Sequence, residues 1–158
     1  MTSSPAIEAD GPQVRRADER DLLAVHDIEA ASFPNPWPYS AFERFVGDPG
    51  FLVAVDDGTV WGFVVADVVP NDGRPLGHVK DLAVHPERRG EGVATTLLSR
   101  ALMVLAQSGV DSVKLEVRES NDAARSLYEQ FGFEPVHRLP EYYRDGADAV
   151  VLVSELRQ

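Results

Sequence analysis

Apolar side chains recur every three or four residues in two segments of the chain, which predicts two amphipathic helices that each bury one face. The apolar positions are Leu22, Val25, Ile28 and Ala31 in the first helix, and Leu97, Leu98, Ala101, Leu102 and Leu105 in the second. Asp18 precedes the first helix and can cap it. That helix must end before residues 33–38, because three prolines there remove hydrogen-bond donors and fix φ. After these prolines, a further and shorter helix is predicted from Tyr39 to about Val46.

Runs of β-branched and aromatic residues predict seven strands. They are Val14–Ala17, Phe51–Val55, Val60–Val69, His78–Val84, Val113–Arg118, Phe133–Arg138 and Ala149–Glu155. Residues 56–58, Asp-Asp-Gly, form a hairpin turn between the second and third runs, and a further helix is predicted over Asn121–Gln130. The resulting order, βααβββαβαββ, predicts an α/β sandwich with a mixed sheet.

The length of 158 residues suits one compact domain, which we expect to cover residues 13–158 behind a flexible N-terminal tail of residues 1–12. The sequence shows no internal repeat and no second-domain linker. Because the chain contains no cysteine, a disulfide framework, a thiolate metal site and a cysteine nucleophile are all excluded. Any catalysis must therefore depend on other side chains.

The charge of the chain restricts its partners. Twenty-six acidic against fifteen basic residues give a formal net charge of −11, which argues against binding to nucleic acid or to an anionic membrane. The longest apolar run is interrupted by Asp67 and is too short to span a bilayer, and residues 1–12 lack the pattern of a signal peptide. We therefore expect a soluble, cytoplasmic protein. Only two basic residues are lysines, which fits either a halophilic or a GC-rich source.

The most informative segment is Leu82–Thr95, in which a predicted strand leads into a helix through Gly90 and Gly92. Such a turn lets several backbone N–H groups converge on an anion at the positive end of a helix, and the missing Cβ allows close approach. The turn lacks the third glycine of a dinucleotide-binding fingerprint and the Gly-Lys-Ser/Thr of a P-loop. It predicts a pyrophosphate site, with the alternative that the glycines serve only to turn the chain.

The same segment resembles motif A of the GNAT N-acetyltransferase superfamily, because Arg89-x-x-Gly92-x-Ala94 matches the pattern Arg/Gln-x-x-Gly-x-Gly/Ala. The resemblance implies that acetyl-CoA is the cosubstrate and that no metal takes part. It also implies that the backbone of one strand segment binds the pantetheine arm and that the amides of the turn hold the pyrophosphate. The strand residues are Leu82, Ala83 and Val84, and the turn residues are Arg89, Gly90, Glu91, Gly92, Val93, Ala94 and Thr95.

A second segment, Leu115–Phe133, is similar to motif B of the same superfamily. It combines Leu-Glu-Val-Arg at 115–118 with an asparagine-led helix and a Gly-Phe exit at 132–133. The resemblance adds Asn121 to the cofactor-binding residues. It also implies the GNAT fold, in which a mostly antiparallel central sheet is flanked by about four helices.

Acetyl transfer to an amine needs a base that removes a proton from the ammonium group and an acid that protonates the departing thiolate. The resemblance implies that Tyr128 is the acid, since the equivalent tyrosine of the family lies beside the sulfur; its alternative is an aromatic packing role. We interpret Glu116 as the base, because a carboxylate in an apolar strand is costly unless it is paired or solvated. The alternative for Glu116 is a surface position or a pairing with Arg118 or Lys114. Competing candidates for the base are Asp81 and, more weakly, His78 and His85.

Other stretches resemble the RimI-type branch of the superfamily, whose members acetylate protein N-termini, including those of ribosomal proteins. Residues 33–42 are similar to its acceptor-side loop, and Tyr142-Tyr143 to its tyrosine pair. The resemblance implies that the acceptor, a protein N-terminus such as that of a ribosomal protein, is bound by Phe33, Trp37, Tyr142 and Tyr143. Hydrophobic packing is an equal alternative for Phe33, whereas we expect Tyr143 to be exposed.

Two other functions stay open at this point. The acceptor can be a small-molecule amine or a lysine side chain, or the chain can be a non-catalytic acyl-CoA-binding module that regulates a partner. Retention of both Glu116 and Tyr128 favours an enzyme, because binding alone requires neither an acid nor a base. We expect a monomer or a weak dimer.

Overall fold

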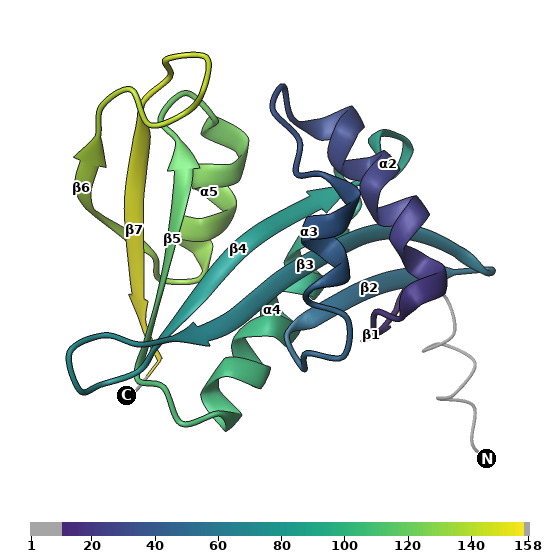
Figure 1. Cartoon of the computed structure of the whole chain (residues 1–158), viewed down its shortest axis with the longest axis horizontal. Helices are drawn as coiled ribbons and strands as arrows, with labels where there is room; N and C mark the ends of the chain where they lie inside the picture. The colour runs from purple at the N-terminus through teal and green to yellow at the C-terminus, as the bar shows by residue number, and fades with distance from the viewer. Residues whose placement is uncertain (1–10, 157–158) are drawn as a thin grey trace. The chain divides into compact units, whose positions relative to one another are not determined.

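The computed structural model describes residues 11–156 of the chain (Figure 1). Most of the predicted tail, residues 1–12, lies outside the described residues. The chain divides into two compact units. The first comprises the described residues up to Val65 together with Asp81–Ala101, and the second comprises Ala66–Lys80 together with the described residues from Leu102 onwards.

Residues 11–156 contain seven strands and four α-helices in the predicted order. The strands are β1 (Gln13–Arg16), β2 (Phe51–Asp56), β3 (Thr59–Val69), β4 (Leu76–Val84), β5 (Ser112–Arg118), β6 (Glu134–Leu139) and β7 (Ala149–Glu155). The helices are α2 (Leu22–Ser32), α3 (Tyr39–Glu43), α4 (Val93–Gln107) and α5 (Asp122–Gln130), with the 3₁₀ turns η1 (Glu19–Asp21) and η2 (Pro86–Arg88). The strand order β1-β2-β3-β4-β5-β7-β6, mostly antiparallel with β4 parallel to β5, confirms the predicted fold class. No helix in this part of the chain is long and apolar enough to cross a membrane.

Differences from the predicted elements lie at their ends. Asp18 is a cap as predicted, but it caps the 3₁₀ turn η1, which precedes α2. Helix α3 ends at Glu43, before the predicted end near Val46. Asn121 is the cap of α5 and not its first residue, since its Oδ1 accepts the N–H of Ala124 at 3.1 Å. These shifts leave the order and the type of every predicted element unchanged.

In the first unit, helices cover both faces of β2 and β3. Val53 pairs with Phe63 across the two strands, so both side chains point to one face. There they join a buried cluster that includes Leu22, Val25 and Ile28 of α2 and Phe42 of α3. Gly62 points to the opposite face, where an added Cβ would lie 3.0 Å from the side chain of Leu97 on α4. Helices α2 and α3 therefore lie on one face of these strands and the first turns of α4 on the other (Figure 1).

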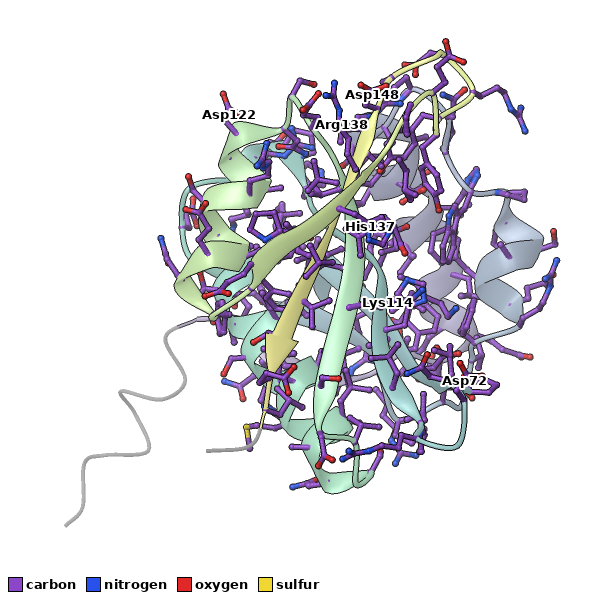
Figure 2. The ribbon with its side chains drawn as sticks, turned by 90° about the vertical axis from the view of Figure 1, so that its left-hand side faces the viewer. Asp72, Lys114, Asp122, His137, Arg138 and Asp148 are labelled. Carbon is purple, nitrogen blue, oxygen red and sulfur yellow. The ribbon has the colours of Figure 1, made fainter. Side chains whose placement is uncertain are left out.

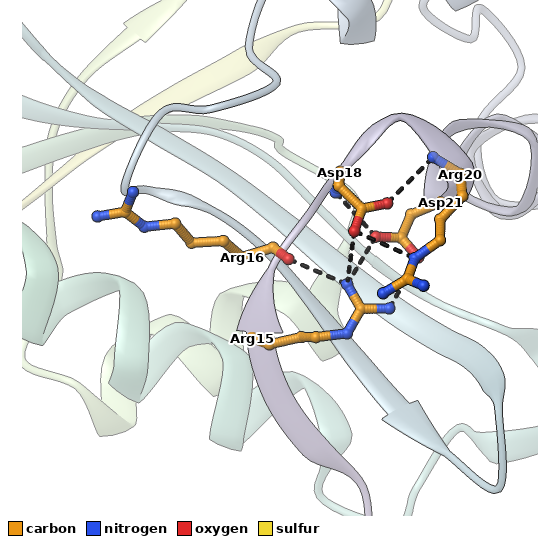
Figure 3. A network of polar contacts seen from close by, with 5 residues as sticks. All are labelled: Arg15, Arg16, Asp18, Arg20 and Asp21. Carbon is orange, nitrogen blue, oxygen red and sulfur yellow. Dashed lines mark hydrogen bonds and ion pairs between the residues drawn. The ribbon is translucent and has the colours of Figure 1, made fainter.

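A network of ion pairs and hydrogen bonds joins β1 to the beginning of α2 (Figure 3). Arg15 donates two hydrogen bonds to the carboxylate of Asp21, at 2.8 and 3.0 Å. The same carboxylate accepts the N–H of Asp18 at 2.9 Å, which completes a capping box around η1. Burial alone would raise the pKa of the Asp21 carboxyl, but the hydrogen bonds from Arg15 and Asp18 hold it below its ordinary value. This buried carboxylate therefore anchors the first strand as an ion.

In the second unit, β5 separates an apolar face from a charged one. Its residues Val113, Leu115 and Val117 are buried, whereas the alternate residues Lys114, Glu116 and Arg118 are only partly buried. Ser154 lies opposite Val113 on β7, and its Oγ donates to the carbonyl of Phe131, just after α5, at 3.0 Å. Helix α5 therefore covers the apolar face, and the charged side chains of β5 lie on the other face.

Replacing Asp21 removes the acceptor of three hydrogen bonds and leaves Arg15 without its buried partner. We expect Asp21→Ala to lower the free energy of unfolding at pH 7 by about 2 kcal/mol, measured by urea denaturation. The matched control is Arg20→Ala, which removes an exposed ion pair with Asp18 and should change that free energy by less than about 0.5 kcal/mol.

The effect of Asp21→Ala should shrink in acid. Because the pKa of the Asp21 carboxyl is lower in the folded than in the unfolded state, the folded state binds fewer protons. The stabilisation is therefore fully present above the ordinary aspartate pKa of about 3.9 and is lost as the pH falls through the lower folded-state value. A destabilisation of undiminished size at about pH 2 would contradict this assignment.

Candidate functional site

The predicted pyrophosphate turn lies in the first unit, between β4 and α4. Gly90 and Gly92 have φ values of +81° and +87°, which side-chain-bearing residues rarely adopt. A Cβ at either glycine would meet no heavy atom within 4 Å, so the turn is open where an anion would approach. Helix α4 begins at Val93, and the N–H groups of its first turn have no partner within the helix. The structure therefore gives the predicted turn residues the geometry of an anion site.

Two arginines fix the turn to its surroundings in the first unit. Arg89 donates from Nε to the carbonyl of Val84 at 3.0 Å and from Nη2 to Ser32 Oγ at 3.0 Å. Arg88 pairs with Asp56 of the β2–β3 hairpin, with Nη2 and Oδ2 3.2 Å apart. The turn is thereby tied to the end of α2 and to the hairpin.

The strand residues predicted to bind the pantetheine arm form the end of β4. Ala83 and Val84 are buried, and Leu82 is partly buried. The N–H of Leu82 donates to Oδ1 of Asp81 at 2.9 Å. The backbone N–H of Leu82 therefore already has a partner, which the sequence did not indicate.

A cluster of charged side chains surrounds Glu116 in the second unit. His78 Nε2 lies 2.8 Å from Glu116 Oε1, and Lys114 Nζ lies 3.6 Å from Glu116 Oε2. Lys80 Nζ lies 3.4 Å from His78 Nδ1 and 3.6 Å from Asp67 Oδ1. Figure 2 shows Lys114 on β5 within this unit. The cluster contains both lysines of the chain, although β4 and β5 are far apart in the sequence.

The hydrogen bond from His78 lowers the pKa of the Glu116 carboxyl below its ordinary value; burial opposes this shift, and the positive charge of Lys114 adds to it. The carboxyl is therefore an anion at neutral pH. Because the carboxylate accepts the Nε2–H of His78, we assign the other ring nitrogen, Nδ1, as the acceptor toward Lys80. Of the alternative partners considered for Glu116, Lys114 is a neighbour, whereas Arg118 pairs with Asp145.

The predicted acid, Tyr128, lies on α5 and is 8 % exposed. Its ring meets Phe133 edge-on, with 5.8 Å between the ring centroids, so the packing role considered above is present. Asn121 uses its Oδ1 as the cap of α5. The structure thus gives both residues a structural role, and their catalytic and cofactor-binding roles stay predictions.

Two of the predicted acceptor-binding aromatics belong to the first unit. The ring of Trp37 packs on Phe42 and Phe45, with centroid distances of 5.2 and 5.9 Å. Phe33 packs against the buried cluster of α2 and α3. Hydrophobic packing is therefore one role of both Phe33 and Trp37.

The predicted tyrosine pair belongs to the second unit, where Arg118 holds its loop. The guanidinium of Arg118 lies 4.4 Å from the centre of the Tyr143 ring and donates to Asp145 at 3.0 Å. Tyr142 is 50 % exposed, whereas Tyr143 is partly buried; the expectation that Tyr143 is exposed is wrong, because Arg118 lies over its ring. Burial, aided by Tyr142, raises the pKa of Tyr143 to about 12, so its phenol is neutral at physiological pH.

Two carboxyl groups that the sequence analysis did not bring together meet in the first unit. Glu29 of α2 is 2 % exposed, and its Oε2 accepts the N–H of Trp37 at 2.9 Å. Burial, together with a hydrogen bond to Glu29, raises the pKa of the Asp81 carboxyl well above its ordinary value. Oδ1 of Asp81 already accepts the N–H of Leu82 and Oδ2 is buried, so neither oxygen is open to an acceptor amine, which argues against Asp81 as the base.

A signal for Glu29 was present in the sequence. It lies seven residues after Leu22 and four after Val25, which places it on the buried face of α2. Ala31, which the apolar periodicity predicts on that face, is exposed. Apolar periodicity alone does not identify a polar residue on the buried face of a helix, and Glu29 is such a residue.

His85, the remaining candidate for the base, has a structural role. His85 accepts the N–H of Glu87 at its Nδ1, 3.0 Å away, and its ring packs edge-on against Trp61. It also borders a pocket of about 760 Å³ between α2 and the β2–β3 hairpin, which no predicted cofactor or acceptor residue lines. Within residues 11–156, no group of three or more His, Asp or Glu side chains is arranged to hold a metal ion.

Comparisons with known proteins agree with the family predicted from the sequence. The model of the acetyltransferase (GNAT) family matches residues 22–133. The N-alpha-acetyltransferase RimI of Mycobacterium tuberculosis is 36 % identical over 84 % of this chain and 85 % of its own. The ribosomal-protein-S18-alanine N-acetyltransferase from Escherichia coli superposes with a TM-score of 0.81 at 27 % identity, covering 93 % of this chain and 95 % of that one. A chain of the NatC complex, in its crystal structure bound to Gag peptide and CoA, superposes with a TM-score of 0.86 at 25 % identity, covering 93 % and 99 %. The chain belongs to the acetyltransferase (GNAT) family and is an acetyl-CoA-dependent N-acetyltransferase.

Proposed function

We propose that the acceptor is the N-terminal α-amino group of a protein, such as a ribosomal protein. The observation that carries this proposal is that Glu116 shares a face of β5 with Arg118, whose guanidinium lies over the ring of Tyr143. Besides burial, the charge of Glu116 raises the pKa of both Tyr142 and Tyr143. A carboxylate on the same side of the strand as these aromatic rings suits the ammonium group at the end of a peptide; the same carboxylate also contacts His78 and Lys114. The names of the M. tuberculosis and E. coli relatives support the same acceptor.

Acetyl-CoA, when bound, supplies the thioester, and we assign its pyrophosphate to the amides of Arg89–Thr95. The open space beside Gly90 and Gly92 fits a group that approaches the backbone closely. The first turn of α4 adds its unpaired N–H groups and its positive end. The backbone of Leu82–Val84 is the proposed partner of the pantetheine arm.

The His78–Glu116 pair is the proposed base. Its carboxylate attracts the ammonium group of the acceptor, and the pair removes one proton, directly or through a water molecule. The neutral amine then attacks the thioester carbon, the C–N bond forms, the C–S bond breaks, and Tyr128 donates a proton to the departing thiolate. The second proton, which the nitrogen loses as the amide forms, restores the Tyr128 phenol. This assignment extends the role predicted for Glu116 alone, because the 2.8 Å contact makes the two side chains one unit.

Two alternative functions differ from this proposal, one in the acceptor and the other in having no catalytic activity. A small-molecule amine or a lysine side chain would need the same base and the same cosubstrate, and the net charge of −11 attracts any cationic acceptor. A non-catalytic acyl-CoA-binding module would have no need of an oriented imidazole–carboxylate pair. The geometry of His78 and Glu116 therefore favours an enzyme over a module.

The acceptor class can be tested by thiol release from acetyl-CoA. The panel contains short peptides with free N-termini, the same peptides with a blocked N-terminus and one internal lysine, and a polyamine. We expect CoA release only with free N-termini, with the acetyl group located on the α-amine by mass spectrometry. Acetyl groups confined to the lysine ε-amine would contradict the proposal, and tight binding of acetyl-CoA without any turnover would favour the regulatory module.

The pyrophosphate assignment can be tested at Gly92. In Gly92→Ala the new methyl group enters the space proposed for the pyrophosphate, and we expect the Kd for acetyl-CoA, measured by calorimetry, to rise at least about tenfold. Gly109→Ala is the matched control, because Gly109 also has a positive φ, +90°, and open space around its Cβ position. Both variants carry the same backbone strain, so an equal loss of affinity in the two would mean that strain and not pyrophosphate contact is responsible.

The base pair can be tested by a double-mutant cycle of His78→Gln and Glu116→Gln. Each single variant should lower kcat/KM for the acceptor by about 100-fold, and the double variant should lose little more, because residues that act as a unit are not additive. Glu119→Gln, an exposed carboxylate of the same unit that pairs with Arg138, is the control and should keep full activity. Losses that multiply in the double variant would contradict a single catalytic unit.

A further inference from the structure

The carboxyl groups of Glu29 and Asp81 form a buried pair that the proposed chemistry does not use. One oxygen of each has a backbone donor: Glu29 Oε2 accepts the N–H of Trp37, and Asp81 Oδ1 accepts the N–H of Leu82, both at 2.9 Å. The other two oxygens, Glu29 Oε1 and Asp81 Oδ2, are buried. Within the described part of the chain, no N–H or hydroxyl group donates a hydrogen bond to either of them. The two carboxyls are neighbours, because Glu29, after burial, is the group that raises the pKa of the Asp81 carboxyl.

Two carboxylates cannot both remain charged in such a place. Each buried, unpaired oxygen of an anion would carry a large desolvation cost, and the two negative charges would repel each other. One shared proton removes both problems, because the protonated carboxyl donates to the other and the pair keeps a single charge. Burial and the neighbouring Glu29 favour the proton on Asp81.

The shared proton completes a continuous chain of hydrogen bonds within the first unit. It begins at the N–H of Trp37, in the loop between α2 and α3, passes through Glu29 and Asp81, and ends at the N–H of Leu82 on β4. Trp37 belongs to the loop predicted to bind the acceptor, and Leu82 to the strand segment predicted to bind the pantetheine arm. The loop has few other regular hydrogen bonds to rely on, since three of its six residues are prolines.

We propose that Glu29 and Asp81 act together as positioning residues for acetyl transfer, holding the acceptor-side loop at Trp37 in a fixed place relative to the cofactor-binding strand through one shared proton. Neither touches the reacting atoms. The part of this inference that concerns acetyl transfer rests on the proposed function, whereas the hydrogen-bond chain itself can be tested without any acceptor.

The first test follows the Trp37 amide by hydrogen exchange, read by NMR. Glu29→Met fills a similar volume but offers no acceptor, and we expect the protection of the Trp37 amide to fall at least about tenfold. Glu29→Gln keeps an acceptor for Trp37 and places an NH₂ donor against Asp81, so protection should stay close to that of the wild type. Glu43→Met, an exposed position on α3, is the matched control. Undiminished protection in Glu29→Met would overturn the proposal, whatever the acceptor proves to be.

The second test is kinetic. In Glu29→Met we expect kcat/KM for the acceptor peptide to fall at least about tenfold while the Kd for acetyl-CoA changes less than threefold, because only the acceptor side has lost its support. Glu29→Gln and Asp81→Asn, which each keep one donor between the two side chains, should stay within about threefold of the wild type in both quantities. If Glu29→Met does not fold, these two conservative variants serve as the kinetic test.

The two tests separate the possible failures. Loss of turnover in Asp81→Asn with recovery at high pH would show that Asp81 is the base and would overturn the positioning role. An equal loss in Glu29→Gln and Glu29→Met would overturn it as well, because the amide replaces the hydrogen bonds. Peptides that are not acetylated by the wild type, together with the expected exchange pattern, would reject only the proposed acceptor and leave the hydrogen-bond chain standing.

Discussion

The alternation of side chains along β5 is the constraint on which the second unit depends. Val113, Leu115 and Val117 are buried on one face of β5, and this fixes the opposite face for Lys114 and Glu116. A register shift of one residue would bury the carboxylate and expose three apolar side chains, so packing and chemistry impose the same register. The parallel pairing of His78 with Lys114 then carries the imidazole of β4 to within reach of Glu116.

Three buried or partly buried carboxyl groups show how partners decide the charge. Asp21 accepts hydrogen bonds from an arginine and a backbone N–H and stays an anion although it is almost wholly buried. Glu116 is held charged in the same way by His78. Burial and a neighbouring carboxyl group, that of Glu29, raise the pKa of Asp81 well above its ordinary value. Burial disfavours the charge in every case, and the identity of the neighbour decides whether it survives.

Much of the architecture was predictable because it depends on local sequence patterns. The order of elements, the cap at Asp18 and both ends of β7 follow from periodicity and from turn residues. The glycine turn was found for the same reason, since the positive φ values of Gly90 and Gly92 require glycine. Such features depend on residues that are near each other in the sequence.

The parts that were missed depend on contacts across the chain. The partner of Glu116 is 38 residues away, and no local pattern prefers His78 over Arg118 or Lys114. Burial and Glu29 of α2 raise the pKa of Asp81, and the ring of Tyr143, in the loop before β7, is covered by Arg118 of β5. Pairing, burial and charge state therefore become known only from the three-dimensional structure.

The scarcity of lysine has a consequence of its own. The enzyme works beside a reactive thioester with only two ε-amino groups, and each is held in an ion pair with a carboxylate. An ammonium group engaged in this way is no nucleophile, so the chain offers acetyl-CoA few opportunities for self-modification.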